Sequence, residues 1–264
     1  MRRAIVVRLV SSAILIPLVL AAVYLGGRVF AGLVAFLCVV MIFEWTRMVE
    51  HRAFSPSFYV LALGATGSLL IAPSGAYGTG LLICALSGAA ALWFSRNQGG
   101  PGLWAAAAAP YIIAPSIALM WLRFEPEAGR ALTFFLYFVV WAADTGAFVT
   151  GKALGGPKIS HALSPNKTWA GIAGGVIGGG LIGLVSGGVF FGFVQWPLFL
   201  ALGGALGAVS VVGDLVESGF KRRFGLKDIS GFIPGHGGAL DRLDGMIFAT
   251  AAMTSAVYIY MLLG

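Results

Sequence analysis

Charged residues are scarce in this sequence. Only 10% of its 264 residues are Asp, Glu, Lys or Arg, whereas 59% are hydrophobic. A soluble globular domain carries about 25% charged residues, so a chain surrounded by water on all sides is excluded. The mean hydropathy is +0.92, which predicts that lipid is the solvent for most of the molecule.

Cysteine is also rare, because only Cys38 and Cys84 occur, in separate apolar stretches. This excludes a disulfide framework and a CxxC redox or metal motif, and both are predicted to be small buried hydrophobic residues. The sequence shows no internal repeat of the kind found in transporters built from two similar halves. The net charge is +7, but no basic run is long enough for an arm that binds nucleic acid, so no nucleic-acid partner is predicted.

Long hydrophobic stretches predict an all-α, polytopic transmembrane helical bundle. A helix needs about 20 apolar residues to cross the hydrocarbon core. Nine stretches fit, at roughly 5–25, 29–46, 57–73, 78–95, 103–122, 131–151, 168–192, 198–216 and 244–263. The first is interpreted as a retained helix that acts as its own insertion signal. The separation of the third and fourth spans is the weakest part of this division.

The positions of the basic residues predict the orientation. With the N-terminus in the cytoplasm and the C-terminus outside, only Arg28, Arg123 and Arg130 of the 17 Lys and Arg residues fall in outside segments. The sequence therefore predicts a multi-pass protein of the cell inner (plasma) membrane, folded as one integral-membrane domain over 1–264. Within it, 1–125 is expected to pack and to make dimer contacts, 131–245 to hold the catalytic spans and cytoplasmic loops, and 244–263 to form the last span.

Glycine is abundant, with 39 residues, and six occur between Gly174 and Gly183. Such spacing lets helix backbones approach closely in lipid. We interpret this stretch as a packing surface rather than a functional site.

Acidic residues gather at the predicted cytoplasmic face. They come from the ends of three spans and from one loop, and they are Asp144, Asp214, Glu217, Asp228, Asp241 and Asp244. A carboxylate at membrane depth is costly unless it is paired or faces water. Several carboxylates beside phosphates are typical of a magnesium site. Glu44, in the second span, is expected to pair with Arg47 or with solvent and is not predicted to be catalytic.

The polar segment 217–244 has the residue types that phosphate chemistry requires. Lys221, Arg222, Arg223 and Lys227 provide cations, and Ser218 and Ser230 provide hydroxyl groups. Residues 234–238 form a Gly-rich turn whose backbone N–H groups suit oxyanions. Asp241 and Asp244 are spaced to share one face of a starting helix.

A second polar segment, 151–168, adds Lys152, Lys158 and Lys167. Ser164 or Asn166, next to Pro165, is expected to cap the helix that follows. The N-terminus of that helix would favour an anion.

These residues resemble the signature of the CDP-diacylglycerol synthase (phosphatidate cytidylyltransferase) family. The matching positions are Ser218, Phe220, Lys221, Arg222, Lys227, Asp228, Ser230, Ile233, Pro234, Gly235, His236, Gly237, Gly238, Asp241, Arg242 and Asp244. Two flanking elements are also similar to the family, namely 213–218 and 164–169 with Gly171, and Asp144 after Trp141 fits as well. In the family, an acidic residue usually precedes the glycine that corresponds to Gly171, whereas this chain has Ala170 there. We therefore expect the element 164–169 to position other groups rather than to take part in the chemistry.

The resemblance implies that CTP and phosphatidic acid react to give CDP-diacylglycerol and pyrophosphate in a magnesium-dependent, commonly dimeric membrane enzyme. We expect Asp144, Asp214, Asp241 and Asp244 to hold magnesium, and a second cation if two are used. The expected catalytic residues are Asp214, Asp241, Asp244, Lys221, Arg222, Ser218 and His236. The expected substrate-binding residues are Lys227, Asp228, Lys167, Ser164, Gly237, Gly238 and Arg242. His236 either orients a phosphate or the base, or stabilises the Gly-rich turn.

Two other functions are compatible with this pattern. A CTP-dependent polyprenol or phytol kinase would transfer the γ-phosphate to an alcohol, and would need a base for the hydroxyl group. A transporter for an anionic solute would also use membrane-edge charges and Gly-rich helices. The concentration of charge at one face, rather than along a path through the midplane, favours an enzyme.

Overall fold

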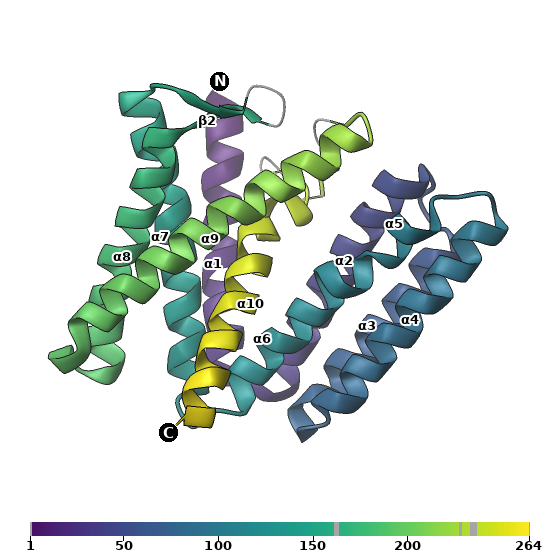
Figure 1. Cartoon of the computed structure of the whole chain (residues 1–264), viewed down its shortest axis with the longest axis horizontal. Coiled ribbons are helices and arrows are strands. Elements are labelled where there is room, and N and C mark those ends of the chain that lie inside the picture. Colours follow the sequence, from purple (N-terminus) through teal and green to yellow (C-terminus); the bar gives the residue numbers. More distant parts are fainter. Residues whose placement is uncertain (1, 161–163, 227–228, 233–236, 264) are drawn as a thin grey trace. The chain divides into compact units, whose positions relative to one another are not determined.

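The computed structural model describes residues 2–160, 164–226, 229–232 and 237–263, which form helices, one β hairpin and connecting turns (Figure 1). The predicted all-α class is confirmed. The chain divides into two compact units. The first comprises Met1–Arg130 and Phe224–Leu243, and the second comprises Ala131–Arg223 and Asp244–Gly264.

The first unit is built from helices that follow one another along the chain. They are α1 (Arg2–Leu25), α2 (Gly27–Glu50), α3 (Pro56–Ile71), the short η1 (Ala72–Ser74), α4 (Tyr77–Asn97), α5 (Gly102–Ala106), η2 (Ala109–Ile113) and α6 (Ala114–Phe124). The last three form one apolar span from Gly102 to Phe124. It widens into a π-helical turn at η2, where Pro110 provides no backbone N–H to a regular helix.

Helix α2 forms the centre of this unit and packs against α3. Trp45 is fully buried. Its ring lies 5.1 Å from that of Tyr111, and its indole Nε1 donates a hydrogen bond of 2.8 Å to the carbonyl oxygen of Trp104. A buried Trp needs such a partner for its N–H. These contacts tie α2 to the span that contains α5 and η2.

The second unit contains α7 (Gly129–Leu154, from Ala131 on), the strands β1 (Lys158–Ser160) and β2 (Ser164–Thr168), α8 (Trp169–Phe191), η3 (Phe193–Gln195), α9 (Trp196–Arg223) and most of α10 (Leu240–Leu263). The strands form an antiparallel hairpin in which Lys158 faces Thr168 and Ser160 faces Ser164. The sequence did not predict this hairpin. It is only three and five residues long, too short for a period-two pattern to be recognised.

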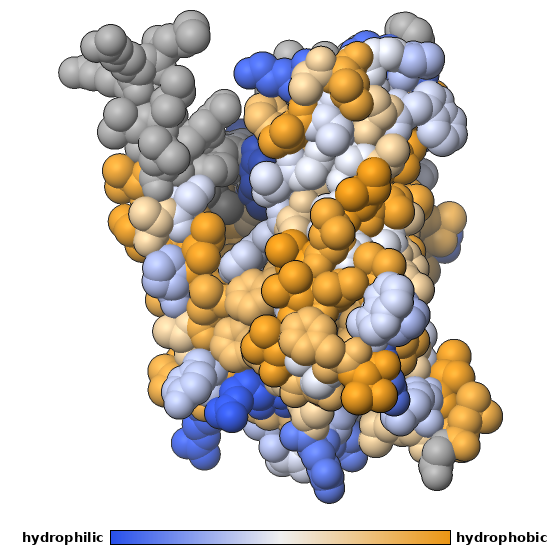
Figure 2. Space-filling view, turned by 90° about the vertical axis from the view of Figure 1, so that its left-hand side faces the viewer, coloured by the Kyte–Doolittle hydropathy of each residue, from blue (hydrophilic) through white to orange (hydrophobic). Residues whose placement is uncertain are grey.

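Glycines allow α8 and α9 to pack backbone against backbone. A Cβ atom on Gly183 would lie 2.6 Å from the carbonyl oxygen of Phe199 and 2.8 Å from Cα of Gly203. On another side of α8, large hydrophobic side chains are exposed at four-residue intervals, namely Ile177, Leu181, Val185 and Val189. In the space-filling view of the side where α8 lies, hydrophobic side chains form a broad band (Figure 2). The glycine stretch is therefore a packing surface, as predicted, and an apolar face of α8 is left for lipid.

The spans agree with the hydropathy analysis. Among the described residues, eight helices are long and apolar enough to cross a membrane, and α1 adds a shorter apolar part, Val10–Leu25. The third and fourth spans are separate helices, joined through Gly75 with φ +79°. Cys38 and Cys84 are buried free cysteines, as predicted.

One boundary was predicted wrongly. Residues 217–223, expected in a loop, continue helix α9 to Arg223. Gly219 within this stretch keeps a helical conformation. Gly225, which follows it, has φ +70°, a conformation that ends helices. Basic side chains in the last turn also favour the helix C-terminus.

We predict that Gly183→Ala destabilises the protein, because the new methyl group meets backbone atoms that cannot move aside alone. Gly32→Ala is the matched control, since a Cβ atom there meets nothing within 4 Å and alanine favours a helix by roughly 1 kcal/mol. Overpacking costs about 1–3 kcal/mol, which corresponds to several degrees in Tm. Thermal unfolding of the detergent-purified variants measures this, and an equal Tm for both variants would contradict close α8–α9 packing.

Candidate active site

Carboxylates from three helices come together at one end of the second unit. Asp144 on α7 accepts a hydrogen bond of 3.2 Å from the hydroxyl of Ser210 on α9. The carboxyl group of Asp244, on α10, lies beside those of Asp214 and Glu217 on α9. Asp244 lies in the second turn of α10, whereas Asp144 and Asp214 lie about ten residues before the C-terminal ends of α7 and α9.

Glycines bring α10 against α9 at this point. A Cβ atom on Gly213 would lie 2.5 Å from the carbonyl oxygen of Asp244, and one on Gly245 would lie 2.6 Å from Ser210 Oγ. Gly245 also donates its N–H to Asp244 Oδ1 at 2.8 Å. The close approach buries Asp244 to 7% exposure and keeps its carboxyl group next to α9.

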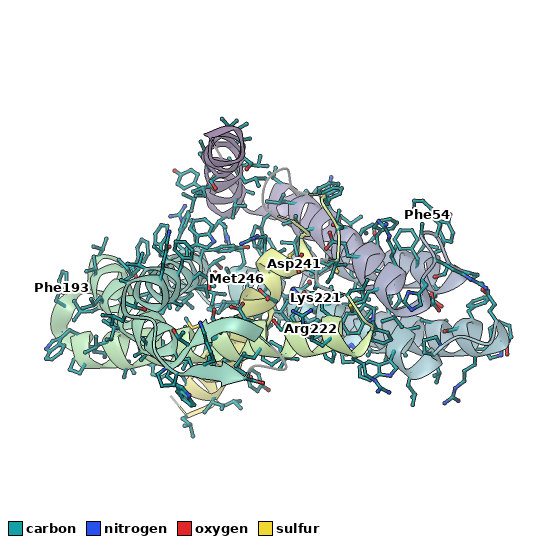
Figure 3. The ribbon with its side chains drawn as sticks, turned by 90° about the horizontal axis from the view of Figure 1, so that it is seen from above. Phe54, Phe193, Lys221, Arg222, Asp241 and Met246 are labelled. Atoms are coloured by element: carbon teal, nitrogen blue, oxygen red, sulfur yellow. The ribbon has the colours of Figure 1, made fainter. Side chains whose placement is uncertain are left out.

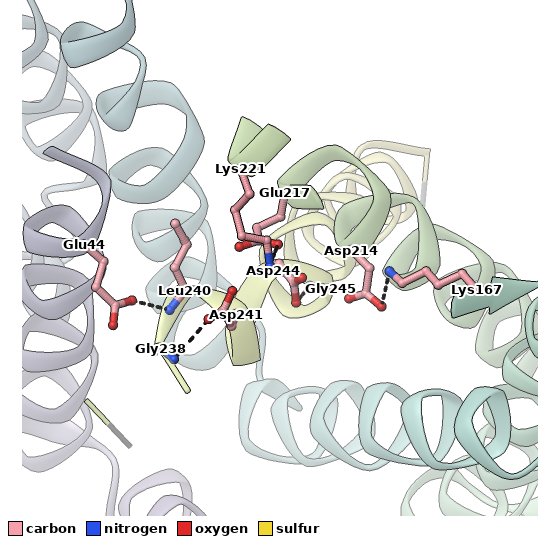
Figure 4. Close-up of polar contacts among 10 residues, drawn as sticks. All are labelled: Glu44, Lys167, Asp214, Glu217, Lys221, Gly238, Leu240, Asp241, Asp244 and Gly245. Carbon is pink, nitrogen blue, oxygen red and sulfur yellow. Dashed lines mark hydrogen bonds and ion pairs between the residues drawn. The ribbon is translucent and has the colours of Figure 1, made fainter. Parts of the chain in front are cut away.

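Two lysines neutralise part of this charge (Figure 4). Lys167 Nζ, from strand β2, lies 2.8 Å from Asp214 Oδ2, and both side chains remain about a quarter exposed. Lys221 Nζ lies 2.6 Å from Glu217 Oε2, one turn away on α9. Two of the carboxylates in the site are thus each paired with a lysine, and the Lys167–Asp214 pair is open to water.

The β hairpin leads directly into α8, and this junction corrects the predicted cap. Thr168, not Ser164 or Asn166, is the N-cap residue, because its hydroxyl accepts a hydrogen bond of 3.1 Å from the Gly171 N–H. Its backbone is extended, with φ −119° and ψ 157°, as an N-cap residue requires. Ser164 lies in β2 instead, three residues before Lys167.

In the first unit, Glu44 on α2 has a role that the sequence analysis did not predict. It is completely buried. Its carboxylate accepts hydrogen bonds from the N–H groups of Ala239, at 3.0 Å, and Leu240, at 2.7 Å, and from the hydroxyl of Ser230. The expected pairing with Arg47 or solvent is therefore wrong. The signal was an acid within the apolar part of a long helix, which should itself have indicated a specific partner.

The described part of the Gly-rich turn lies against the same carboxylate (Figure 4). Gly238 donates its N–H to Asp241 Oδ2 at 3.1 Å. A Cβ atom on Gly238 would lie 2.9 Å from Glu44 Oε1 and 3.1 Å from Asp241 Oδ2, and Gly237 has φ +92°. Only glycine fits both positions without strain.

The other predicted site residues lie on the adjoining helix ends or outside the described residues. Lys221 and Arg222 are in the last turn of α9, one turn after Ser218 (Figure 3). Asp241 and Asp244 both lie in the first two turns of α10, with Arg242 exposed between them. Lys227, Asp228 and His236 are outside the described residues.

The donor atoms of the second unit suit a hard cation bound together with phosphates. Among the described residues, no group of three or more His, Cys, Asp or Glu side chains is arranged to hold a metal ion. Magnesium is commonly held by one or two carboxylates, with phosphate oxygens and waters completing the shell. Asp214 and Asp244 are adjacent carboxylates of this kind. The residues present therefore have the donor chemistry of an open cation site rather than that of a closed protein cage.

Comparison with known proteins gives several matches over nearly the whole chain and others over half of it. The sequence model described as "Cytidylyltransferase family" matches residues 6–261. The phosphatidate cytidylyltransferase of Brucella suis is 37% identical over 254 residues, covering 93% of this chain and 90% of that protein. The protein of the same name from Haemophilus influenzae is 32% identical over 290 residues, covering 96% and 97%. One from Staphylococcus saprophyticus is 42% identical over 134 residues, covering 50% and 51%.

The family match, over residues 6–261, includes all the acids described above, and the two long alignments cover more than nine tenths of the chain. The chain belongs to the cytidylyltransferase family.

Proposed function

We propose that this protein transfers the cytidylyl group of CTP to phosphatidic acid, giving CDP-diacylglycerol and pyrophosphate. The observation that carries the proposal is the alignment, over nearly the whole chain, with proteins named phosphatidate cytidylyltransferase. The cluster of carboxylates and lysines at one end of the second unit supports it, because it provides the groups that the chemistry of two phosphates needs.

In this reaction a phosphate oxygen of phosphatidic acid attacks the α-phosphorus of CTP. The bond from that phosphorus to the bridging oxygen breaks, and pyrophosphate leaves. Both reactants are anions, so neutralisation of charge is the dominant requirement. Lys221 and Lys167 are suited to bind phosphate oxygens, with Arg222, Lys227 and Arg242 as further cations. The lipid phosphate is already anionic at neutral pH, so no general base is required.

Magnesium is part of the proposal. Asp214 and Asp244 would hold it, with Asp144 and Asp241 as further oxygen donors. The bound ion would neutralise charge on the triphosphate and on the leaving pyrophosphate. Lys167 pairs with Asp214 across 2.8 Å. When Asp214 binds a cation, Lys167 would be free to form an ion pair with a phosphate oxygen nearby.

The remaining parts of the proposal concern location and assembly. We place the protein in the cell inner membrane as a homodimer, with its site at the cytoplasmic face. The concentration of Lys and Arg in the segments on that side supports this orientation. The acyl chains of phosphatidic acid would stay in the bilayer while its phosphate reaches the helix ends.

The proposed function predicts the products. Purified protein incubated with labelled CTP, magnesium and a panel of lipid phosphates should form CDP-diacylglycerol and pyrophosphate from phosphatidic acid. Lipid phosphate plus CDP from a polyprenol would instead support the kinase, and uptake into liposomes without turnover would support a transporter.

We predict that Asp244→Asn and Asp214→Asn each lower the rate of CDP-diacylglycerol formation by at least about 100-fold, the order of effect of removing a group that stabilises transition-state charge. Glu127→Gln, at an exposed position, is the control and should leave the rate unchanged. The initial rate is measured over a range of magnesium concentrations. Wild-type turnover with unchanged magnesium dependence in either Asp variant would contradict the assignment of a metal ligand.

Lys221→Ala is predicted to raise the KM for CTP or phosphatidic acid about tenfold or more, because a charged hydrogen bond to phosphate contributes roughly 1.5–3 kcal/mol. The control is Arg52→Ala, because Arg52 is an exposed residue whose guanidinium bonds to Gln98. Steady-state kinetics with each substrate varied in turn separates the two cases. Unchanged values of KM and kcat would remove Lys221 from the site.

A further inference from the structure

The start of α10 has no capping side chain of its own. Ala239 precedes the helix, and its carbonyl oxygen accepts from the N–H groups of Arg242 and Leu243 at 3.1 Å each. Ala239 is thus in the N-cap position, where Ser, Thr, Asp or Asn normally provides an acceptor. The first N–H groups of a helix have no partner within it, and alanine provides none.

Glu44 supplies the missing acceptor from another helix. Its two carboxylate oxygens accept from the N–H groups of Ala239 and Leu240. A negative charge at this point also interacts favourably with the positive end of the helix dipole. The cap of α10 therefore comes from α2, which lies nearly 200 positions earlier in the chain.

The same carboxylate holds part of the connection between α9 and α10. The hydroxyl of Ser230 donates to Glu44 and accepts from the N–H of Phe232 at 3.1 Å. The ring of Phe232 lies 6.4 Å from that of Phe36, two turns before Glu44 on α2. Helix α2 thus contacts this connection through a charge and through an aromatic ring.

Glu44 is linked to Asp241 through Gly238. The N–H of Gly238 donates to Asp241, and Gly238 has no space for a Cβ atom between the two carboxylates. A shift of the Glu44 carboxylate would therefore move the turn that orients Asp241.

We propose that Glu44 is a positioning residue for the reaction. From α2 it holds the start of α10 and Gly238 so that Asp241 keeps its working orientation, without touching either substrate. This inference rests on the proposed function, because it assigns Asp241 to the reacting groups.

The test compares Glu44→Gln with Glu50→Gln on the same helix. Glutamine keeps the size of Glu44 but removes the charge and turns an N–H₂ group toward a backbone donor. Glu50 is the matched control, because its carboxylate accepts from the hydroxyl of Ser57 on α3. Ser230→Ala is a milder variant that removes only the hydroxyl donor, and it keeps the test valid if Glu44→Gln fails to fold.

The first measurement is hydrogen–deuterium exchange of the purified protein without substrates. Glu44→Gln should make the amides of residues 239–243 exchange at least about tenfold faster, because local opening no longer breaks bonds to a buried carboxylate. Glu50→Gln should leave them unchanged. Wild-type exchange in Glu44→Gln would overturn the proposal, whatever the activity.

The second measurement is a double-mutant cycle on kcat with Asp241→Asn. We expect Glu44→Gln to lower kcat about 10- to 100-fold in the wild-type background, the scale of a misplaced catalytic group. In the Asp241→Asn background it should change kcat less than twofold, because residues that act through each other are not additive. Full additivity, or a wild-type kcat for Glu44→Gln, would show that Glu44 acts only on stability and would overturn the positioning role.

Failure of the proposed function is distinguishable from failure of this inference. If wild-type protein formed no CDP-diacylglycerol, the proposed function would fail, and the positioning of Asp241 for that reaction would fail with it. The exchange experiment would still decide whether Glu44 holds the start of α10.

Discussion

The structure depends on how a chain with only ten acidic residues satisfies those that lie within its long apolar helices. An unpaired carboxylate in an apolar environment costs several kcal/mol, so each needs a donor nearby. Glu44 obtains backbone amides and a hydroxyl, Asp214 obtains Lys167, and Glu217 obtains Lys221. Two of these pairings also determine where another segment lies, because their donors belong to the start of α10 and to the β hairpin, whereas Lys221 is on the same helix as Glu217.

Glycine makes these pairings geometrically accessible. In lipid, helices gain little from hydrophobic burial and associate through close packing of small residues. The contact of Gly183 with Gly203 brings α8 to α9, and the contact of Gly213 with Gly245 brings α9 to α10. In the second case the glycines lie beside Ser210 and Asp244, so the packing that assembles this unit also sets the separation of the carboxylates. A substituent at Gly213 would displace the backbone of Asp244 itself.

Much of the fold could be predicted from the sequence, because hydropathy over about 20 residues is a local property and the bilayer sets the length of each span. The spans, the role of the glycines and the helical placement of Asp241 and Asp244 follow from such local patterns. The Thr168 cap, the β hairpin and the extension of α9 depend on the backbone conformation of single residues near element ends, where prediction is weakest. The partners of Glu44 could not be predicted, because Ser230 and Leu240 are 186 and 196 positions away and no local pattern joins them.

Asp214 and Glu44 differ in the kind of partner that each carboxylate has, and this difference suits them to different roles. Lys167 is a long, flexible side chain, and its ion pair with Asp214 is partly exposed, so a metal ion or phosphate can replace either partner at little cost. The amides of Ala239 and Leu240 are part of a helix start and cannot be withdrawn without unwinding it. Glu44 is also fully buried, so it offers no open face to a substrate. Exchangeable partners are compatible with the proposed role of Asp214 in binding a cation, whereas permanent backbone partners are compatible with the proposed role of Glu44 in positioning Asp241.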